Sequence, residues 1–211
     1  MVVILMGPAG SGKTTIGVRL AESLGWPYHE GDDFHPPENV ALMRAGTPLG
    51  DAERAPWLAA LAALIAEHIA AGTSAVLACS ALKREYRRAL VPEAAPPNAV
   101  RFVYLRATPQ LLEQRLSGRR GHFFSAEMLA SQLAALQEPG EGEAAPVTTV
   151  DAAASPEALV RRIRREIGVR WAASRRGSVA RRFTRRRGAA ERSSTIQARS
   201  WEPFLELGYR L

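Results

Sequence analysis

This sequence has only one cysteine, no long apolar run and no segment that resembles a signal peptide. Cys79 is the single cysteine among 211 residues, so no intrachain disulfide can form and a reducing cytoplasm is the expected compartment. No stretch approaches the roughly 20 uninterrupted apolar residues that a membrane-spanning helix needs. The apolar run over residues 1–6 is too short for a signal peptide and has no basic leader. We therefore expect a cytoplasmic protein without a membrane partner.

Excess basic charge is missing from most of the chain, although the formal net charge is +7. Residues 1–169 hold 17 Lys/Arg and 18 Asp/Glu, a net charge of −1, whereas residues 170–211 hold 11 Arg and 3 Glu, a net charge of +8. The near-neutral body gives no electrostatic reason to expect a polyanionic partner. We divide the chain into a body, residues 1–169, and an arginine-rich extension, residues 170–211, which we expect to be poorly ordered.

Short apolar runs alternate with segments of helical spacing along the body. Strands are predicted at residues 2–6, 27–30, 75–79, 100–105 and 147–150. Helices are predicted at residues 13–24, 56–71, 83–90, 109–116, 126–137 and 156–167. Parallel strands need crossover connections, so this alternation predicts an α/β fold of three layers, with a five-stranded parallel sheet covered by helices on both faces.

A phosphate-binding loop follows the first predicted strand. Residues 7–14 read GPAGSGKT and match G-x-x-x-x-G-K-[ST] at every fixed position. The glycines let backbone N–H groups turn toward phosphate oxygens, and the N-terminus of the next helix adds its dipole. Lys13 is placed to reach the β- and γ-phosphates, and the Thr14 hydroxyl to ligate Mg²⁺. The predicted ATP site consists of Gly7, Pro8, Ala9, Gly10, Ser11, Gly12, Lys13, Thr14 and Thr15; an unliganded glycine-rich turn is the alternative.

The phosphate acceptor has to be read from another segment, because the loop identifies a nucleotide and not a reaction. Ligands of parallel sheets bind beyond the carboxyl ends of the strands, and the second predicted strand ends in EGDDFHP, residues 30–36. Asp32 and Asp33 would lie at the mouth of the nucleotide site, where a carboxylate can accept the proton of an attacking hydroxyl or hold a water on Mg²⁺. His35 adds a hydrogen-bonding group without obligatory charge. A plain Gly-Asp-Asp turn is the alternative.

The string GDDFHPPENVALMRAGTPLGDAERAPWL, residues 31–58, closely resembles the gluconokinase family of small P-loop kinases. CSALK at residues 79–83, RRGHFF at 119–124 and LQEPG at 136–140 agree with the same family in order and spacing. The resemblance covers about residues 2–168, and the extension has no counterpart in it. It implies a shikimate-kinase-like P-loop fold with a helical lid, and transfer of the γ-phosphoryl group of ATP to the 6-hydroxyl of D-gluconate.

The resemblance also implies roles for single residues. Asp32 is the candidate base or orienting group for the acceptor hydroxyl, and no role is carried onto Asp33. Arg54 would clamp the gluconate carboxylate, because a guanidinium bonds that ion bidentately; a structural salt bridge is the alternative. The implied catalytic residues are Lys13, Asp32 and Arg119, and the implied substrate-binding residues are Asp32, His35, Arg54, Lys83 and His122.

Residues 117–124, SGRRGHFF, are the predicted lid. Glycines flank Arg119 and Arg120, and a guanidinium above the γ-phosphate would neutralise charge as the phosphoryl group departs. The family resemblance favours Arg119 for this role, and His122 would help to exclude water from the closed site. A solvated basic loop is the alternative.

Two other functions compete with gluconate phosphorylation. Shikimate kinase is the nearest enzyme rival, but its glycine triplet after the third strand is replaced here by CSALK. Binding of nucleic acid through the arginines of residues 170–211 is the second, because such a segment neutralises phosphates without reading sequence. The sequence does not determine the oligomeric state, and a homodimer is one alternative.

Overall fold

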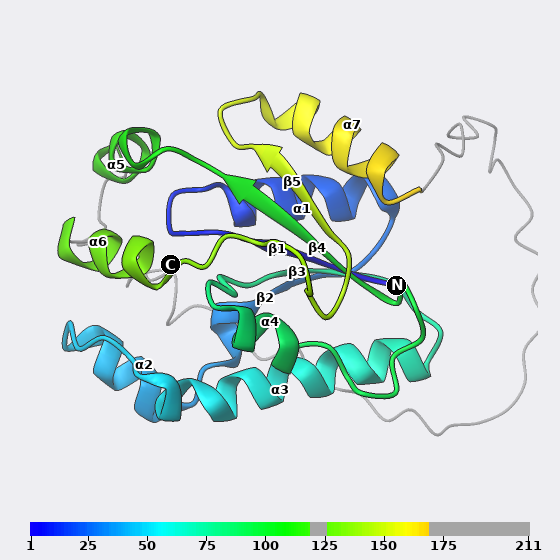
Figure 1. The fold of residues 1–211 in the computed structure, drawn as a ribbon, viewed down its shortest axis with the longest axis horizontal. Coiled ribbons are helices and arrows are strands. Elements are labelled where there is room, and N and C mark those ends of the chain that lie inside the picture. Colours follow the sequence, from blue (N-terminus) through cyan, green and yellow to red (C-terminus); the bar gives the residue numbers. More distant parts are fainter. Residues whose placement is uncertain (119–125, 169–211) are drawn as a thin grey trace, which may run out of the picture.

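The computed structural model describes residues 1–118 and 126–168, which form a parallel sheet between two layers of helices (Figure 1). The strands are β1 (Val2–Met6), β2 (Tyr28–Glu30), β3 (Ala75–Ala78), β4 (Val100–Arg106) and β5 (Val147–Asp151). The helices are α1 (Lys13–Leu24), α2 (Pro37–Arg44), α3 (Asp51–Ala70), α4 (Arg84–Ala89), α5 (Pro109–Ser117), α6 (Ala126–Ala135) and α7 (Pro156–Glu166), with a 3₁₀ helix η1 (Gly31–Phe34) after β2. The strand order is β2-β3-β1-β4-β5, and every pairing is parallel. The predicted α/β fold with a five-stranded parallel sheet is confirmed.

Side-chain alternation along β1 separates the two hydrophobic cores. Val2, Ile4 and Met6 face the core under α3 and α4. Val3 and Leu5 face the core under α1 and α7. Figure 1 shows these helix pairs on opposite sides of the sheet. The central strand is buried throughout, as expected for a parallel strand covered on both faces. Because the strands run in one direction, the loops that follow β1, β2 and β3 meet at one edge of the sheet.

The start of α3 differs from the sequence-based prediction. We expected a helix from residue 56, yet α3 begins at Asp51 and contains Pro56. Gly50 precedes the helix in an extended conformation, and its N–H donates to the Glu53 carboxylate at 2.8 Å. This contact satisfies a backbone donor at the helix start. Pro56 therefore lies beyond the first turn of α3 and does not mark its beginning.

Two short elements were not predicted at all, namely η1 and α2. Neither carries an apolar stripe that periodicity could detect, and both lie between the acidic turn and α3. The predicted lid residues 119–124 fall outside the described residues, as does the extension 170–211. Within residues 1–118 and 126–168, no helix combines the length and the apolar character needed to cross a membrane.

Candidate active site

The loop between β1 and α1 is bent by glycines with left-handed backbone angles. Gly7, Gly10 and Gly12 have φ of 142°, 80° and 101°, values that side chains disfavour. Gly12 directly precedes Lys13, the first residue of α1. The N–H groups of the first turn of that helix therefore lie beside the loop, which is the arrangement that binds phosphate. The structure places the predicted loop residues in the context that the motif requires.

Lys13 and Arg115 hold this loop from two sides. The Lys13 side chain is buried, and its Nζ donates to the Gly7 and Pro8 carbonyl oxygens at 3.0 and 3.1 Å. Arg115 of α5 donates through Nη1 to the Gly10 and Ser11 carbonyls at 3.4 and 3.3 Å. Sequence reasoning missed Arg115, because nothing in the local pattern distinguishes it from a surface arginine of a helix.

Several hydroxyl and carboxylate side chains lie close together where β2 ends. Thr14 Oγ1 donates to Glu30 Oε2 at 2.8 Å, and Tyr28 Oη donates to the same oxygen at 2.6 Å. Glu30 is buried, and Asp32 follows two residues later. Mg²⁺ usually takes one or two carboxylates together with substrate phosphates, so these residues fit that ion. No cluster of three His, Cys, Asp or Glu residues suited to a metal occurs within the described part of the chain. The sequence analysis did not name Glu30 as a candidate residue for Mg²⁺, although the Glu-x-Asp spacing of Glu30 and Asp32 could have indicated it.

A cavity of about 120 Å³ adjoins the loop. Its walls come from the phosphate-binding loop, η1, the α2–α3 segment, the β3–α4 segment and α6. The lining residues are Lys13, Asp32, His35, Met43, Thr47, Pro48, Leu49, Arg54, Trp57, Ser80, Leu82, Tyr86, Met128, Ser131, Gln132 and Ala135. Four predicted site residues, Lys13, Asp32, His35 and Arg54, therefore line one cavity although they come from three separate segments of the sequence.

Gly31 and Trp57 fix the acidic turn beside this cavity. A Cβ on Gly31 would lie 2.4 Å from the Ala78 carbonyl oxygen, so only glycine allows this approach of η1 to β3. Trp57 Nε1 donates to the Gly31 carbonyl at 2.7 Å. The His35 ring stacks on Trp57, with centroids 4.4 Å apart and planes inclined by 11°. Burial, assisted by the nearby Arg54 charge, lowers the pKa of His35 to about 4. His35 is therefore a neutral imidazole at physiological pH.

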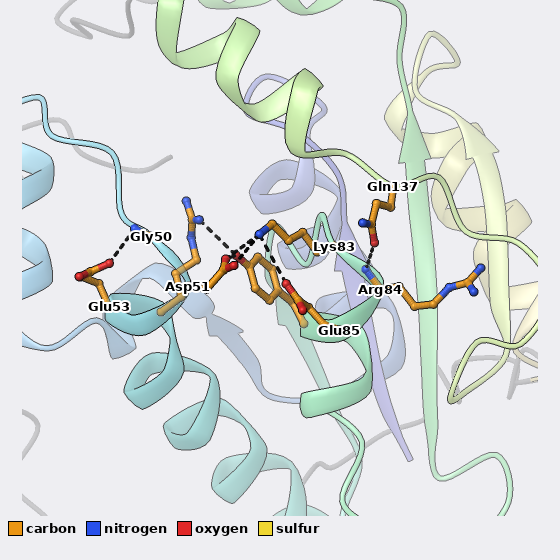
Figure 2. Close-up of polar contacts among 9 residues, drawn as sticks. Gly50, Asp51, Glu53, Lys83, Arg84, Glu85 and Gln137 are labelled. Carbon is orange, nitrogen blue, oxygen red and sulfur yellow. Dashed lines mark hydrogen bonds and ion pairs between the residues drawn. The ribbon is translucent and has the colours of Figure 1, made fainter.

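Lys83 and Arg54 have different electrostatic surroundings, and Figure 2 shows the pairing of Lys83 with Asp51. Lys83 Nζ donates to both Asp51 carboxylate oxygens, at 2.7 and 2.8 Å, and this hydrogen bond raises the pKa of Lys83. Arg54 Nη1 donates to the Tyr86 hydroxyl at 3.3 Å, and within the described residues it forms no ion pair with a carboxylate. Arg54 lines the cavity, whereas Lys83 is not among the lining residues. The predicted substrate contacts thus divide into an arginine facing the cavity and a lysine paired with Asp51.

Two predicted site residues, Arg119 and His122, lie outside the described residues, and their roles stay predictions.

Cys79 is fully buried, and this burial raises the pKa of its thiol to about 12. A thiol that stays protonated is a poor nucleophile, so Cys79, which directly follows β3, is a structural residue.

Comparison with known proteins finds relatives that cover most of this chain. A family model described as an AAA domain matches residues 2–139. A gluconokinase from Gluconobacter oxydans is 45% identical over 158 residues, which cover 75% of this chain and 86% of that protein. A sugar kinase from Janibacter, solved without ligand, has a TM-score of 0.71 and 40% identity, covering 79% of this chain and 95% of its own. A gluconokinase from Sinorhizobium meliloti has a TM-score of 0.67 and 38% identity, covering 79% and 90%.

Proposed function

The chain belongs to the gluconokinase family, and we propose that it transfers the γ-phosphoryl group of ATP to the 6-hydroxyl of D-gluconate, giving 6-phospho-D-gluconate and ADP. One observation carries the assignment of the site. A single cavity joins Lys13 of the phosphate-binding loop to Asp32 and Arg54, which is the set that an ATP-dependent kinase needs for an acidic sugar. The loop supplies the donor side, the carboxylate faces the acceptor hydroxyl and the guanidinium suits the carboxylate of the substrate.

The donor side works mainly by positioning and by charge. Phosphoryl transfer asks for little covalent chemistry from the protein. Lys13 brings a positive charge to the β- and γ-phosphates, and it is already held inside the loop by the Gly7 and Pro8 carbonyls. Preorganised charge is effective because it costs no rearrangement during the reaction. We propose that Thr14, with Glu30 and Asp32 nearby, holds Mg²⁺; when bound, that ion would neutralise charge on the transferring phosphates.

The acceptor side works by fixing gluconate at both ends. Arg54 would bond the carboxylate, and Asp32 would orient the 6-hydroxyl and accept its proton as the new P–O bond forms. Neutral His35 can hydrogen-bond a sugar hydroxyl without adding charge, and Trp57 holds its ring in place. We propose that Arg119 and His122 contribute to the closed site, where exclusion of water prevents wasteful hydrolysis of ATP.

The compartment that we propose is the cytoplasm, where the single cysteine, Cys79, would stay reduced. A homodimer, and binding of polyanions by the extension, stay hypotheses about this chain.

The proposed function is tested by measuring ADP release with ATP, Mg²⁺ and a panel of aldonic acids, neutral sugars and shikimate. We expect turnover with gluconate and little with glucose, which lacks the carboxylate. Identification of the product as 6-phosphogluconate by phosphorus NMR would locate the phosphoryl group. Turnover of shikimate without turnover of gluconate would overturn the assignment.

A further inference from the structure

A glutamine of α6 is hydrogen-bonded to the phosphate-binding loop. The Ala9 N–H donates to Gln132 Oε1 at 2.7 Å, joining residues 123 positions apart in the sequence. Chemistry fixes the orientation of the carboxamide, because an N–H donor requires the oxygen as acceptor. The NH₂ group of Gln132 has no hydrogen-bond partner within residues 1–118 and 126–168. Half of this carboxamide therefore secures α6 to the loop, while the other half remains available.

Gln132 competes with the nucleotide for the backbone donor to which it is bonded. Ala9 is the third residue of GPAGSGKT, a loop whose N–H groups cradle phosphate oxygens. A phosphate oxygen is charged, so its hydrogen bonds with backbone N–H groups are roughly twice as strong as those of a neutral carboxamide. Binding of a triphosphate is therefore expected to take over the Ala9 N–H and to release the Gln132 oxygen.

The released side chain would still lie at the acceptor site. Gln132 lines the same cavity as Asp32 and Arg54, and α6 also contributes Met128 and Ser131 to its wall. A carboxamide freed from Ala9 has both an acceptor and two donors for a polyhydroxylated substrate or for the transferring phosphoryl group. The same residue thus contacts the donor side in one arrangement and the acceptor side in the other.

We propose that Gln132 is a positioning residue that couples the two substrates, so that ATP binding frees its carboxamide for the acceptor. This inference rests on the proposed function for the identity of the acceptor, but not for its nucleotide half. Because coupling between two ligands is reciprocal, nucleotide in the loop raises the affinity for gluconate, and gluconate raises the affinity for nucleotide.

The test compares the full-length protein with Gln132→Leu, Gln132→Glu and the control Gln137→Leu. The Gln137 carboxamide also accepts a backbone N–H, that of Arg84 at 2.8 Å (Figure 2), so the control removes the same kind of bond away from the loop. Calorimetry gives the Kd of a non-hydrolysable ATP analogue, and the Kd of gluconate with and without that analogue. Gluconate turnover by the wild-type protein is measured first, and its absence would count against the proposed function alone.

The two substitutions are expected to act in opposite directions on the nucleotide. Gln132→Leu removes the competitor for Ala9, so the analogue binds about two- to tenfold more tightly, in line with the worth of one hydrogen bond. Gln132→Glu places a carboxylate at the same N–H, so the analogue binds more weakly. Both variants lose the effect of the analogue on gluconate affinity, whereas Gln137→Leu retains it.

A purely structural role for Gln132 predicts another result. Loss of packing would weaken the nucleotide in Gln132→Leu and would lower its thermal midpoint. Weaker nucleotide binding in Gln132→Leu, or coupling of wild-type size in either variant, would overturn the proposal. If Gln132→Leu does not fold, the Gln132→Glu variant still decides, because the proposal requires both weaker nucleotide binding and lost coupling in it.

Discussion

Tyr86 joins Arg54 to Asp51: its hydroxyl accepts from Arg54 Nη1 at 3.3 Å and donates to the Asp51 carboxylate. Asp51 meanwhile neutralises Lys83 through two hydrogen bonds. The Asp51 carboxylate thus compensates the Lys83 charge directly. It is linked to Arg54 only through the neutral Tyr86 hydroxyl. Arg54 keeps its charge for a ligand in the cavity, and the Tyr86 hydroxyl fixes the direction of the guanidinium.

Arg54→Lys is therefore expected to raise the KM for gluconate at least tenfold, with a much smaller change in the KM for ATP. Lysine keeps the charge but loses the planar fork that binds a carboxylate bidentately. Steady-state kinetics with each substrate varied separately measure the two constants. Arg84→Lys is the matched control, since Arg84 is half exposed beside Glu143 and away from the cavity. Unchanged constants in Arg54→Lys would make Arg54 a structural residue.

Lys13→Ala is expected to lower kcat by a factor on the order of 10² or more, while the protein remains folded. The charge of Lys13 acts on the phosphates, where preorganisation makes it most effective. Turnover and thermal unfolding are measured on the same sample. Lys13→Arg, which keeps the charge but is larger and differently shaped, serves as a second variant. Near-normal turnover in Lys13→Ala would show that this loop does not hold the reacting phosphates.

Breaking the ion pair between Arg87 and Glu143 should destabilise the fold. The guanidinium is fully buried and donates to both Glu143 oxygens at 2.8 and 2.6 Å, while its Nη1 also binds the Ala81 and Leu82 carbonyls. Glu143→Gln would leave a buried charge uncompensated, which costs about 3–5 kcal/mol of unfolding free energy. Urea denaturation measures this loss.

Glu157→Gln is the matched control for that measurement. Glu157 pairs with Arg19 across an exposed surface, where ion pairs contribute little because water and salt screen them. Its urea midpoint is expected to equal that of the wild type. An equal midpoint for Glu143→Gln would mean that the Arg87 contacts to the Ala81 and Leu82 carbonyls suffice without the carboxylate.

The lowered pKa of His35 predicts that the folded protein loses stability in mild acid. The pKa of His35 is about 4 in the folded protein and near the ordinary histidine value of 6.5 in the unfolded chain. Between these values the unfolded chain binds the proton and the folded protein does not, so the free energy of unfolding falls as the pH is lowered from 6.5 to 4. Below about 4 this group causes no further loss.

Urea unfolding at pH 7.5, 6.5, 5.5 and 4.5 measures this dependence, and His35→Gln should flatten it. His29→Gln is a comparison, because burial and His68 lower the pKa of His29 in the same direction. The lowered pKa values of Asp51 and Glu143 contribute stability that is lost at more acidic pH, through their own folded pKa values. A slope that His35→Gln leaves unchanged would contradict a buried neutral His35.

The sequence predicted the parts of this molecule that depend on local pattern. β1 lies where the continuous apolar run before Gly7 placed it. α1 lies where the helical spacing of apolar residues placed it, between Gly12 and Gly25. The GPAGSGKT loop carries its chemistry in consecutive residues, so its position required no knowledge of the fold. Arg54 could be assigned only through family resemblance, since its meeting with Asp32 depends on how α3 packs beside η1.

Other parts could not be predicted, because they depend on tertiary contacts. The pairing of Lys83 with Asp51 joins the starts of α3 and α4 and has no local signal. The predicted contact of Lys83 with the substrate stays a prediction. The contact of Gln132 with Ala9 links elements at opposite ends of the body. The early start of α3 was missed because the Ala/Leu-rich pattern begins only at residue 56, whereas the Glu53 contact to Gly50 begins the helix at Asp51.

Removal of residues 170–211 is expected to leave gluconate phosphorylation largely intact. The sheet and both helix layers are complete by α7, which ends at Glu166, and the cavity is lined by residues 13–135. The extension carries a net charge of +8 against −1 for residues 1–169. Truncation should therefore change polyanion binding, which fades as salt screens the arginines, and should leave the KM values for ATP and gluconate unchanged.

The decisive comparison sets the truncated protein beside the full-length protein in one buffer, with activity, thermal midpoint and heparin retention measured for both. A matched variant with the same 11 arginines of residues 170–211 changed to glutamine separates charge from length. Retained activity with lost heparin binding in both variants would assign the extension a purely electrostatic effect. Trp201, Phe204, Leu205 and Leu207 make the opposite result physically sensible, because apolar side chains gain by burial. Lost turnover on truncation alone would therefore mean that these residues pack against the catalytic body, and that the boundary at residue 169 is misplaced.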